Sequence, residues 1–201
     1  MALLFANNNS LSEITTLPSS ISGGGMTLIS EQTASSSATI SFTSGIDDTY
    51  DKYVFKFYDI HPATDGASFQ FNMSIDSGSN YNVTKTTTYF TAYNYESGGT
   101  PALTYAASVD LAQSTAFQNV NSGVGSNNDQ CAVGTLHLFN PSSTTFVKHF
   151  INNGNTAEAA DLSSNVFVAG YGNTTSAVDA VQFKMSSGNI DSGVIKLYGV
   201  S

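Results

Sequence analysis

Residues 178–200 read VDAVQFKMSSGNIDSGVIKLYGV, and this stretch decides the fold class. In its first half Val181, Phe183 and Met185 alternate with polar residues, which is the period-2 pattern of a strand with one buried face. Ser187-Gly188-Asn189 follows as a turn signal, and a second alternation begins a few residues later. We therefore predict a β-hairpin whose last strand runs almost to the end of the sequence.

The rest of the chain repeats this pattern of short alternating segments separated by Gly, Asn and Ser. Strands spaced in this way, with almost no helix, predict an antiparallel β-sandwich or jelly roll of about 8–10 strands. Residues 106–117 are the only helix candidate, and residues 152–164 read as a polar loop. The other expected strands are residues 39–42, 53–60, 68–76, 84–93, 132–139, 145–151 and 165–171.

Three of these strands carry more specific expectations. Bulky residues on both faces of 53–60 indicate a central strand or one covered by a subunit. Strands 132–139 and 145–151 are separated by an Asn-Pro-Ser-Ser turn, so we expect them to form a hairpin. Strand 68–76 is expected to point Phe69, Phe71, Met73 and Ile75 inward and Gln70, Asn72 and Ser74 outward.

Residues 1–37 differ from the remainder, because polar runs separate short apolar pieces. Pieces of this length cannot form a core, so we interpret residues 1–37 as an extended N-terminal arm that lies on its own surface or on a neighbour. A mobile leader is the alternative, since such polar runs are also typical of disorder. Residues 38–201 then form one β domain, a size common for undivided all-β folds.

Composition excludes several classes of function. All six basic residues are lysines, against fifteen acids, and the formal net charge is −9. Binding to nucleic acid needs a basic face that displaces counterions, and six scattered lysines are not expected to form one. Insertion into a membrane is not expected either, because no apolar run reaches about 18 residues. The single Cys131 excludes an internal disulfide, and the N-terminus lacks the pattern of a secretion signal.

No catalytic or metal-binding motif emerges from the titratable residues. His137 and His149 lie on one expected hairpin without a third ligand nearby, so they read as polar cross-strand neighbours rather than a zinc site. No Gly-x-Ser-x-Gly elbow accompanies the many serines. The acids at 47–51 and Asp76 read as turn formers rather than glycosidase carboxylates. Residues 76–80 resemble half of a calcium loop but lack its final glutamate. The sequence predicts no enzyme, no metal and no cofactor.

The chain has ten tyrosines and no tryptophan, and the tyrosines say more about function than the titratable residues do. Tyrosine supplies stiff amphipathic contact area for subunit interfaces and for sugars. We expect contacts between copies of the chain, with a glycan site as the alternative. The expected glycan contacts are Tyr95 and Tyr105. The expected interface residues are Leu3, Leu4, Phe5, Ile14, Leu17, Met26, Leu28, Tyr58, Tyr89 and Tyr93.

Several segments, among them ATISFTSGID, YVFKFYDIHPATD, LHLFNPSSTTFVKHF and the closing GNIDSGVIKLYG, resemble a family of small virion structural proteins of marine tailed bacteriophages. The resemblance covers the chain from about residue 27. It implies a place in the virion, after assembly in the bacterial host cytoplasm, and no active site. It also implies that the chain forms a homotrimer and contacts other virion proteins.

Two functions follow as hypotheses. In the first, the β bodies associate and the arm ties each copy to the particle, as a capsid decoration or a tail or fibre component. In the second, the body is an adhesin whose loops, such as residues 94–101 and 121–129, bind a receptor or glycan on the host.

Overall fold

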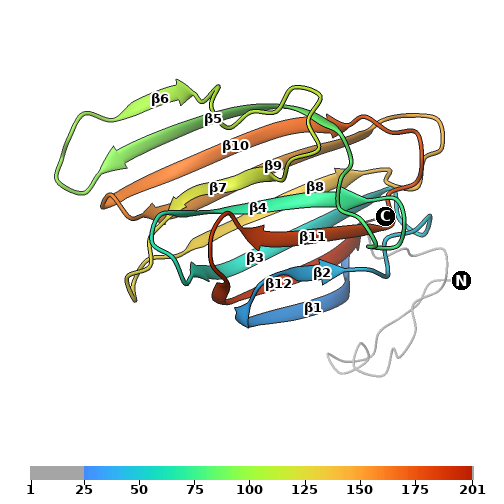
Figure 1. Cartoon of the computed structure of the whole chain (residues 1–201), viewed down its shortest axis with the longest axis horizontal. Coiled ribbons are helices and arrows are strands. Elements are labelled where there is room, and N and C mark those ends of the chain that lie inside the picture. Colours follow the sequence, from blue (N-terminus) through green and yellow to red (C-terminus); the bar gives the residue numbers. More distant parts are fainter. Residues whose placement is uncertain (1–24, 201) are drawn as a thin grey trace, which may run out of the picture.

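The computed structural model describes residues 25–200, and this part of the chain is all-β with antiparallel pairing throughout (Figure 1). The expected fold class is therefore confirmed, with more strands than the alternation indicated. The twelve strands are β1 (Met26–Ser37), β2 (Ile40–Phe42), β3 (Lys52–Pro62), β4 (Ala67–Ser74), β5 (Lys85–Tyr95), β6 (Ala102–Tyr105), β7 (Gln118–Val124), β8 (Ala132–Phe139), β9 (Lys148–Glu158), β10 (Leu162–Gly172), β11 (Ala180–Met185) and β12 (Ile190–Val200).

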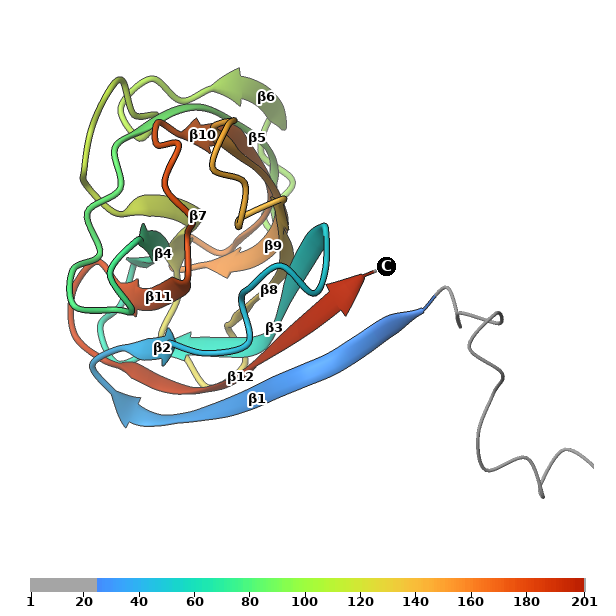
Figure 2. The same ribbon diagram turned by 90° about the vertical axis from the view of Figure 1, so that its right-hand side faces the viewer.

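The strands form two layers. The long layer has the order β1-β12-β3-β8-β9-β10-β5-β6, and the short layer has the order β2-β11-β4-β7. Figure 2 shows the long layer curling around the short one. One residue pair, Val124 with Glu158, connects β7 to β9 and joins both layers into a single sheet that nearly closes on itself.

Aromatic side chains fill the space between the layers. Phe183 of β11 lies at their centre, with its ring stacked on Phe69 of β4 at 5.5 Å and edge-on to Phe55 of β3 at 5.3 Å. Phe71 of β4 meets Phe150 of β9 edge-on at 4.9 Å. All five rings are buried. Edge-to-face and offset contacts of this kind add to the free energy of simple burial, so this cluster holds the two layers together.

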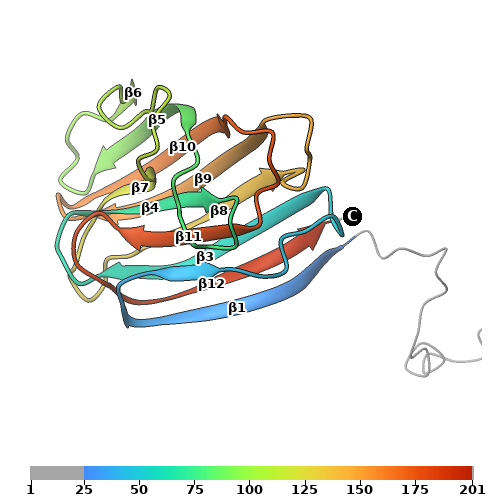
Figure 3. The ribbon, with the colours of Figure 1, turned by 45° about the vertical axis from the view of Figure 1, so that its right-hand side comes forward.

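The predicted hairpin at the C-terminus is wrong, although both of its strands exist. β11 pairs with β2 and β4 in the short layer, whereas β12 pairs with β1 and β3 in the long layer. The turn at Ser187-Gly188-Asn189 therefore crosses from one layer to the other, as the view in Figure 3 also shows. Alternation predicts a strand and its buried face, but it carries no information about the partner strand.

The described part of the predicted arm belongs to the body. Residues 26–37 form β1, which pairs with β12 from Met26 opposite Val200 to Ser37 opposite Ile190. Ile29 and Ala34 of β1 pack against the core, which the arm boundary at residue 37 did not anticipate. The arm interpretation is therefore corrected for residues 26–37, and its earlier residues lie outside the part of the chain that the structure describes.

Two local predictions also fail. Residues 106–117, the helix candidate, form a loop that returns to the sheet through one β-bridge between Lys85 and Ser114. Residues 152–158, expected in a polar loop, continue β9. The predicted hairpin of β8 and β9 is confirmed, with Leu138 opposite Phe150.

Candidate functional surfaces

The outward face of the long layer is the surface with the most distinctive composition. The register of the strands aligns its side chains in rows, because directly paired residues share a face. One such row runs across all eight strands: Glu31, Lys196, Lys56, Thr135, Asn153, Phe167, Phe90 and Tyr105. Charged residues occupy one end of this row and aromatic residues the other, so the face divides into two halves.

The half formed by β8, β9, β10, β5 and β6 has no Asp, Glu or Lys among its outward positions, and we call it the uncharged half. Phe90 stacks on Phe167 at 5.1 Å, and its neighbour Tyr105 is 56% exposed. Leu103 and Ile151 are 71% and 50% exposed on the same face. The other outward residues are Val133, Thr135, His137, Phe139, His149, Asn153, Asn155, Ala157, Ser163, Asn165, Ala169, Tyr171, Thr86, Thr88, Ala92 and Asn94.

The half formed by β1, β12 and β3 carries half of the lysines of the chain. Lys52, Lys56 and Lys196 face outward here together with Tyr58 and Tyr198, and we call these five residues the Lys–Tyr strip. The Nζ of Lys56 lies 5.6 Å from the ring centroid of Tyr198, and the Nζ of Lys196 lies 5.9 Å from that of Tyr58. These distances are within the range of cation–π attraction.

Glu31 of β1 is the acidic residue paired with the strip, and Asp59 of β3 and Asp191 of β12 are further exposed acids on these strands. The carboxylate of Glu31 accepts a hydrogen bond from the Nζ of Lys196 at 2.8 Å, and the pair raises the pKa of Lys196. The lysines also act on the neighbouring half: burial lowers the pKa of His137, and the charges of Lys52 and Lys56 lower it further. Lys52 and Lys56 are therefore close enough to His137 to act on it electrostatically.

An open depression of about 410 Å³ lies within the strip, lined by Glu31, Tyr58, Val194 and Lys196. Irregular pairing surrounds it, because β3 bulges between Phe57 and Ile60 and β12 bulges between Ser192 and Val194. Gly193 lies within the β12 bulge, and a Cβ there would lie 2.9 Å from the carbonyl oxygen of Asp59. Bulges redirect side chains beside binding sites, and here they leave Tyr58 at the rim of a hollow.

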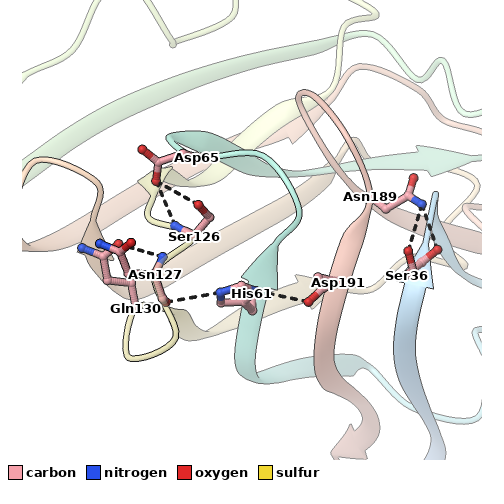
Figure 4. Close-up of polar contacts among 8 residues, drawn as sticks. All are labelled: Ser36, His61, Asp65, Ser126, Asn127, Gln130, Asn189 and Asp191. Carbon is pink, nitrogen blue, oxygen red and sulfur yellow. Dashed lines mark hydrogen bonds and ion pairs between the residues drawn. The ribbon is translucent and has the colours of Figure 1, made fainter.

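A cluster of polar loops at one end of the body, shown in Figure 4, contains the histidine nearest to an acid. The Nδ1 of His61 lies 3.6 Å from Oδ2 of Asp191, while its Nε2 faces the carbonyl oxygen of Asn127 at 3.3 Å. The nearby Ser126 bonds to Asp65 instead of to His61. These contacts tie β3, β12 and the loop before β8 together, and they do not form the hydroxyl–imidazole relay of a hydrolase.

The histidines and the aspartate that the sequence analysis compared with metal sites make ordinary contacts with their neighbours. His137 lies opposite Ile151, and His149 lies beside the ring of Tyr171, so the two imidazoles are not cross-strand partners. In the turn after β4, Asn80 and Ser74 donate hydrogen bonds to Asp76, and these bonds lower the pKa of its carboxyl. Among residues 25–200, no group of three His, Cys, Asp or Glu side chains is placed to hold a metal ion.

The tyrosines predicted to mediate contacts have different environments. Tyr58 is 40% exposed on the Lys–Tyr strip, which leaves it available to a partner. Tyr89 is buried and its hydroxyl lies 2.7 Å from that of Ser122, so the prediction that it forms an interface is wrong. Its position in an alternating segment did not reveal that β5 turns this side inward. Tyr93 is half-buried, with its ring edge-on to Tyr95.

The remaining predicted contact residues divide between exposed positions and positions that the structure does not describe. Met26 and Leu28 are exposed on β1. Tyr95 and Tyr105 are exposed, but Tyr105 pairs with Phe90, five residues from Tyr95 along β5, so the two expected glycan contacts do not form one site. Leu3, Leu4, Phe5, Ile14 and Leu17 lie outside the described residues.

Sequence reasoning missed two groups of residues that the structure brings together. The Lys–Tyr strip combines residues of β3 and β12, which are more than a hundred positions apart in the sequence. Two further lysines, Lys85 and Lys148, are buried between the layers. Nothing in their local sequence distinguishes them from surface lysines.

Comparison with known proteins adds no assignment: the chain matches no protein-family model, no curated protein and no solved structure. Within the part of the chain that the structure describes, no helix has the length and apolar character needed to cross a membrane.

Proposed function

We propose that this protein is a bacteriophage virion structural protein that associates with copies of itself on the particle surface, as a capsid decoration or a tail or fibre component. The observation that carries the proposal is the uncharged half of the outward face. Copies of a chain with a net charge of −9 repel one another. A face whose strand positions carry no acids or lysines, with Asp110 of the adjoining loop bonded to Tyr105 at its edge, is where they can meet with few like charges in contact.

The composition of the uncharged half also resembles that of a protein interface. Interface cores are depleted in charged residues and enriched in aromatic ones. This half combines Phe90, Phe167 and Tyr105 with the exposed aliphatic side chains of Leu103 and Ile151. A patch of this kind on an isolated body marks an interaction site. A symmetric homo-oligomer, with the trimer as the expected state, uses one such patch on every copy.

In this proposal the residues that precede β1 attach the protein to the particle, because β1 itself is part of the body. A virion protein also needs no catalytic centre, and the resemblance of the sequence to virion structural proteins supports the same placement. Electron microscopy of particles labelled with antibody against the body would test it. Absence of the protein from purified particles would contradict the proposal.

Self-association is tested by adding a charge to the uncharged half. Ile151→Lys places an ammonium group on β9 within this half, and a buried unpaired charge weakens an interface by roughly tenfold or more. Ile75→Lys is the matched control, because Ile75 is similarly exposed in the turn after β4, away from this face. In analytical ultracentrifugation we expect wild type and Ile75→Lys to form oligomers and Ile151→Lys to dissociate. A monomeric wild type, or equal association of both variants, would contradict the proposal.

The alternative function is recognition of a host receptor or glycan, and the depression in the Lys–Tyr strip favours it. A variant lacking residues 1–24 discriminates between the two functions, because it retains β1. If the protein is structural, this variant no longer joins particles. If the protein is an adhesin, its binding to host cells or glycans survives the deletion.

A further inference from the structure

Lys56 and Lys196 are directly opposed on β3 and β12, and their side chains leave the same face of the sheet. Like charges at directly opposed positions of an antiparallel pair destabilise it. The chain has only six lysines in 201 residues, so this juxtaposition is not a by-product of a lysine-rich surface. Residues that lower the stability of a protein are often found where they contribute to its function, so we expect this lysine pair to take part in binding.

The two ammonium groups are held apart by different partners. Lys56 extends over the ring of Tyr198, while Lys196 extends towards Tyr58 and the carboxylate of Glu31. Lys196 therefore lines the open depression, whereas Lys56 extends along the strip towards Tyr198, and Lys52 adds a third cation on the same strand as Lys56. Glu31 and the exposed Asp59, which follows Tyr58, are the acids of these strands nearest to the strip, and the three lysines outnumber them, so the strip as a whole favours an anion.

The depression is open to solvent and has the volume of a small-molecule site. Its volume of about 410 Å³ lies within the range of roughly 300–1,000 Å³ that such sites occupy. Its lining combines the aromatic ring of Tyr58 with an acceptor, Glu31, and a donor, Lys196. An exposed aromatic ring beside hydrogen-bonding groups can stack on an apolar ring face and bind hydroxyl groups around it.

We propose that the Lys–Tyr strip binds an acidic saccharide. A pyranose ring lies against Tyr58 with its carboxylate facing Lys196, a further carboxylate of the same saccharide faces Lys56 along the strip, and Glu31 accepts a hydrogen bond from a ring hydroxyl. A simple inorganic anion would use the lysines but not the tyrosine, and a neutral sugar would use the tyrosine but not the opposed lysines. This inference deepens the recognition function and does not depend on self-association.

The test titrates the full chain with trigalacturonate and follows the signals of the strip by NMR. We expect saturable binding that shifts the signals of Tyr58 and Lys196. Maltotriose, which has no carboxylate, and inorganic phosphate, which has no sugar ring, are each expected to bind at least about tenfold more weakly. The absence of trigalacturonate binding, or equal binding of either comparison compound, overturns the proposal. Equal binding of an acidic peptide such as tetraglutamate also overturns it.

Two variants locate the site and separate binding from folding. Lys56→Gln is expected to lose about tenfold or more in affinity for trigalacturonate, while its melting temperature stays the same or rises because the like-charge pair is removed. Tyr58→Ala is expected to lose a similar factor. Lys184→Gln and Tyr95→Ala are the matched controls, since Lys184 extends over Phe117 and Tyr95 lies beside Tyr93. A lower melting temperature for Lys56→Gln, or equal losses in the controls, contradicts the proposal.

The same measurements distinguish this inference from the proposed structural function. Ile151→Lys, which is expected to dissociate the oligomer, should still bind trigalacturonate, because Ile151 lies on the uncharged half. If Ile151→Lys dissociates and no variant binds the saccharide, self-association stands and the saccharide site is wrong. If Lys56→Gln loses saccharide binding and wild type is monomeric, the saccharide site stands alone.

Discussion

The Nζ of Lys85 lies 2.5 Å from the Oδ1 of Asn72, and this contact joins β5 of the long layer to β4 of the short layer. Both side chains are fully buried. The amine donates its other hydrogen bond to the carbonyl oxygen of Val83 at 2.7 Å, so both of its partners are neutral. Burial without a nearby carboxylate partner lowers the pKa of Lys85 to about 7.

This buried amine predicts a pH dependence of stability. The pKa of Lys85 in the folded state is about 7, below the value of about 10.4 for an unfolded chain. The unfolded state therefore binds more protons between these values, and the contribution of Lys85 to stability decreases as the pH falls from about 10.4 to 7. Below that range the contribution stays constant at its lowest value.

Lys85→Met removes the amine and with it the loss of stability that its burial causes at lower pH. We expect its free energy of unfolding, relative to wild type, to rise by on the order of a few kcal/mol as the pH is lowered from 9.5 to 7. Urea unfolding at several pH values measures the difference. Lys184→Met, on the outer side of β11, is the matched control and should follow the wild-type profile. A pH-independent difference for Lys85→Met would show that Lys85 is charged throughout.

The aromatic cluster predicts which core substitution is most harmful. Phe183→Ala removes the ring that touches both layers, and loss of a buried phenylalanine costs about 3–5 kcal/mol. Phe146→Ala, at a position that is 70% exposed, is expected to change stability by less than about 0.5 kcal/mol. Thermal unfolding monitored by circular dichroism compares the two. Similar melting temperatures would mean that Phe183 does not connect the layers as described.

Gly193 should tolerate a side chain less well than another glycine with positive φ. Gly193 has φ of 131°, and a Cβ there would lie 2.8 Å from Cδ1 of Ile60 and 2.9 Å from the carbonyl oxygen of Asp59. Gly98 has φ of 74° and open space around the corresponding position. We expect Gly98→Ala to cost about 1 kcal/mol from strain alone and Gly193→Ala about 2–3 kcal/mol. Equal losses in denaturant midpoint would argue against the close packing of the β12 bulge.

Removal of β1 is expected to destabilise the body. A variant lacking residues 1–37 loses the pairing partner of β12 and uncovers the edge of an apolar strand, which favours aggregation. A variant lacking only residues 1–24 is the reference. We expect the shorter protein to melt at a lower temperature and to scatter more light on heating. Identical melting curves would contradict the structural role of β1.

The sequence predicted strands well where alternating side chains follow the burial of the sheet. β8 has the predicted bounds, and Phe69, Phe71 and Met73 of β4 are buried as expected. The same strand also shows where alternation fails. Asn72 and Ser74 are buried although polar, because neighbouring loops cover the end of β4 and supply acceptors such as the carbonyl oxygen of Tyr81. Ile75 lies beyond the strand and is exposed.

The missed extension of β9 has a related cause. Its inward positions after Phe150 are Asn152, Gly154 and Thr156, which read as a loop. In the structure they face a polar part of the interior, where Asn152 donates to the carbonyl oxygen of Val120 and Asn121 donates to Thr156. Apolar periodicity cannot indicate a strand whose buried face is polar.

The candidate surfaces could not be predicted because they depend on strand order. The Lys–Tyr strip requires β3 beside β12, and the uncharged half requires five strands whose neighbours are not set by local sequence. The sequence did single out Tyr58 as a contact residue, since its strand has bulk on both faces. It gave no sign that Lys196 would lie beside it.

Because Met26 is paired with Val200, the chain enters β1 and leaves β12 at one corner of the body, while the connection between β5 and β6 lies at the far end (Figure 1). A body tethered through that corner presents residues 96–101 outermost. Foreign peptides inserted there would be displayed at the end of the body farthest from the tether.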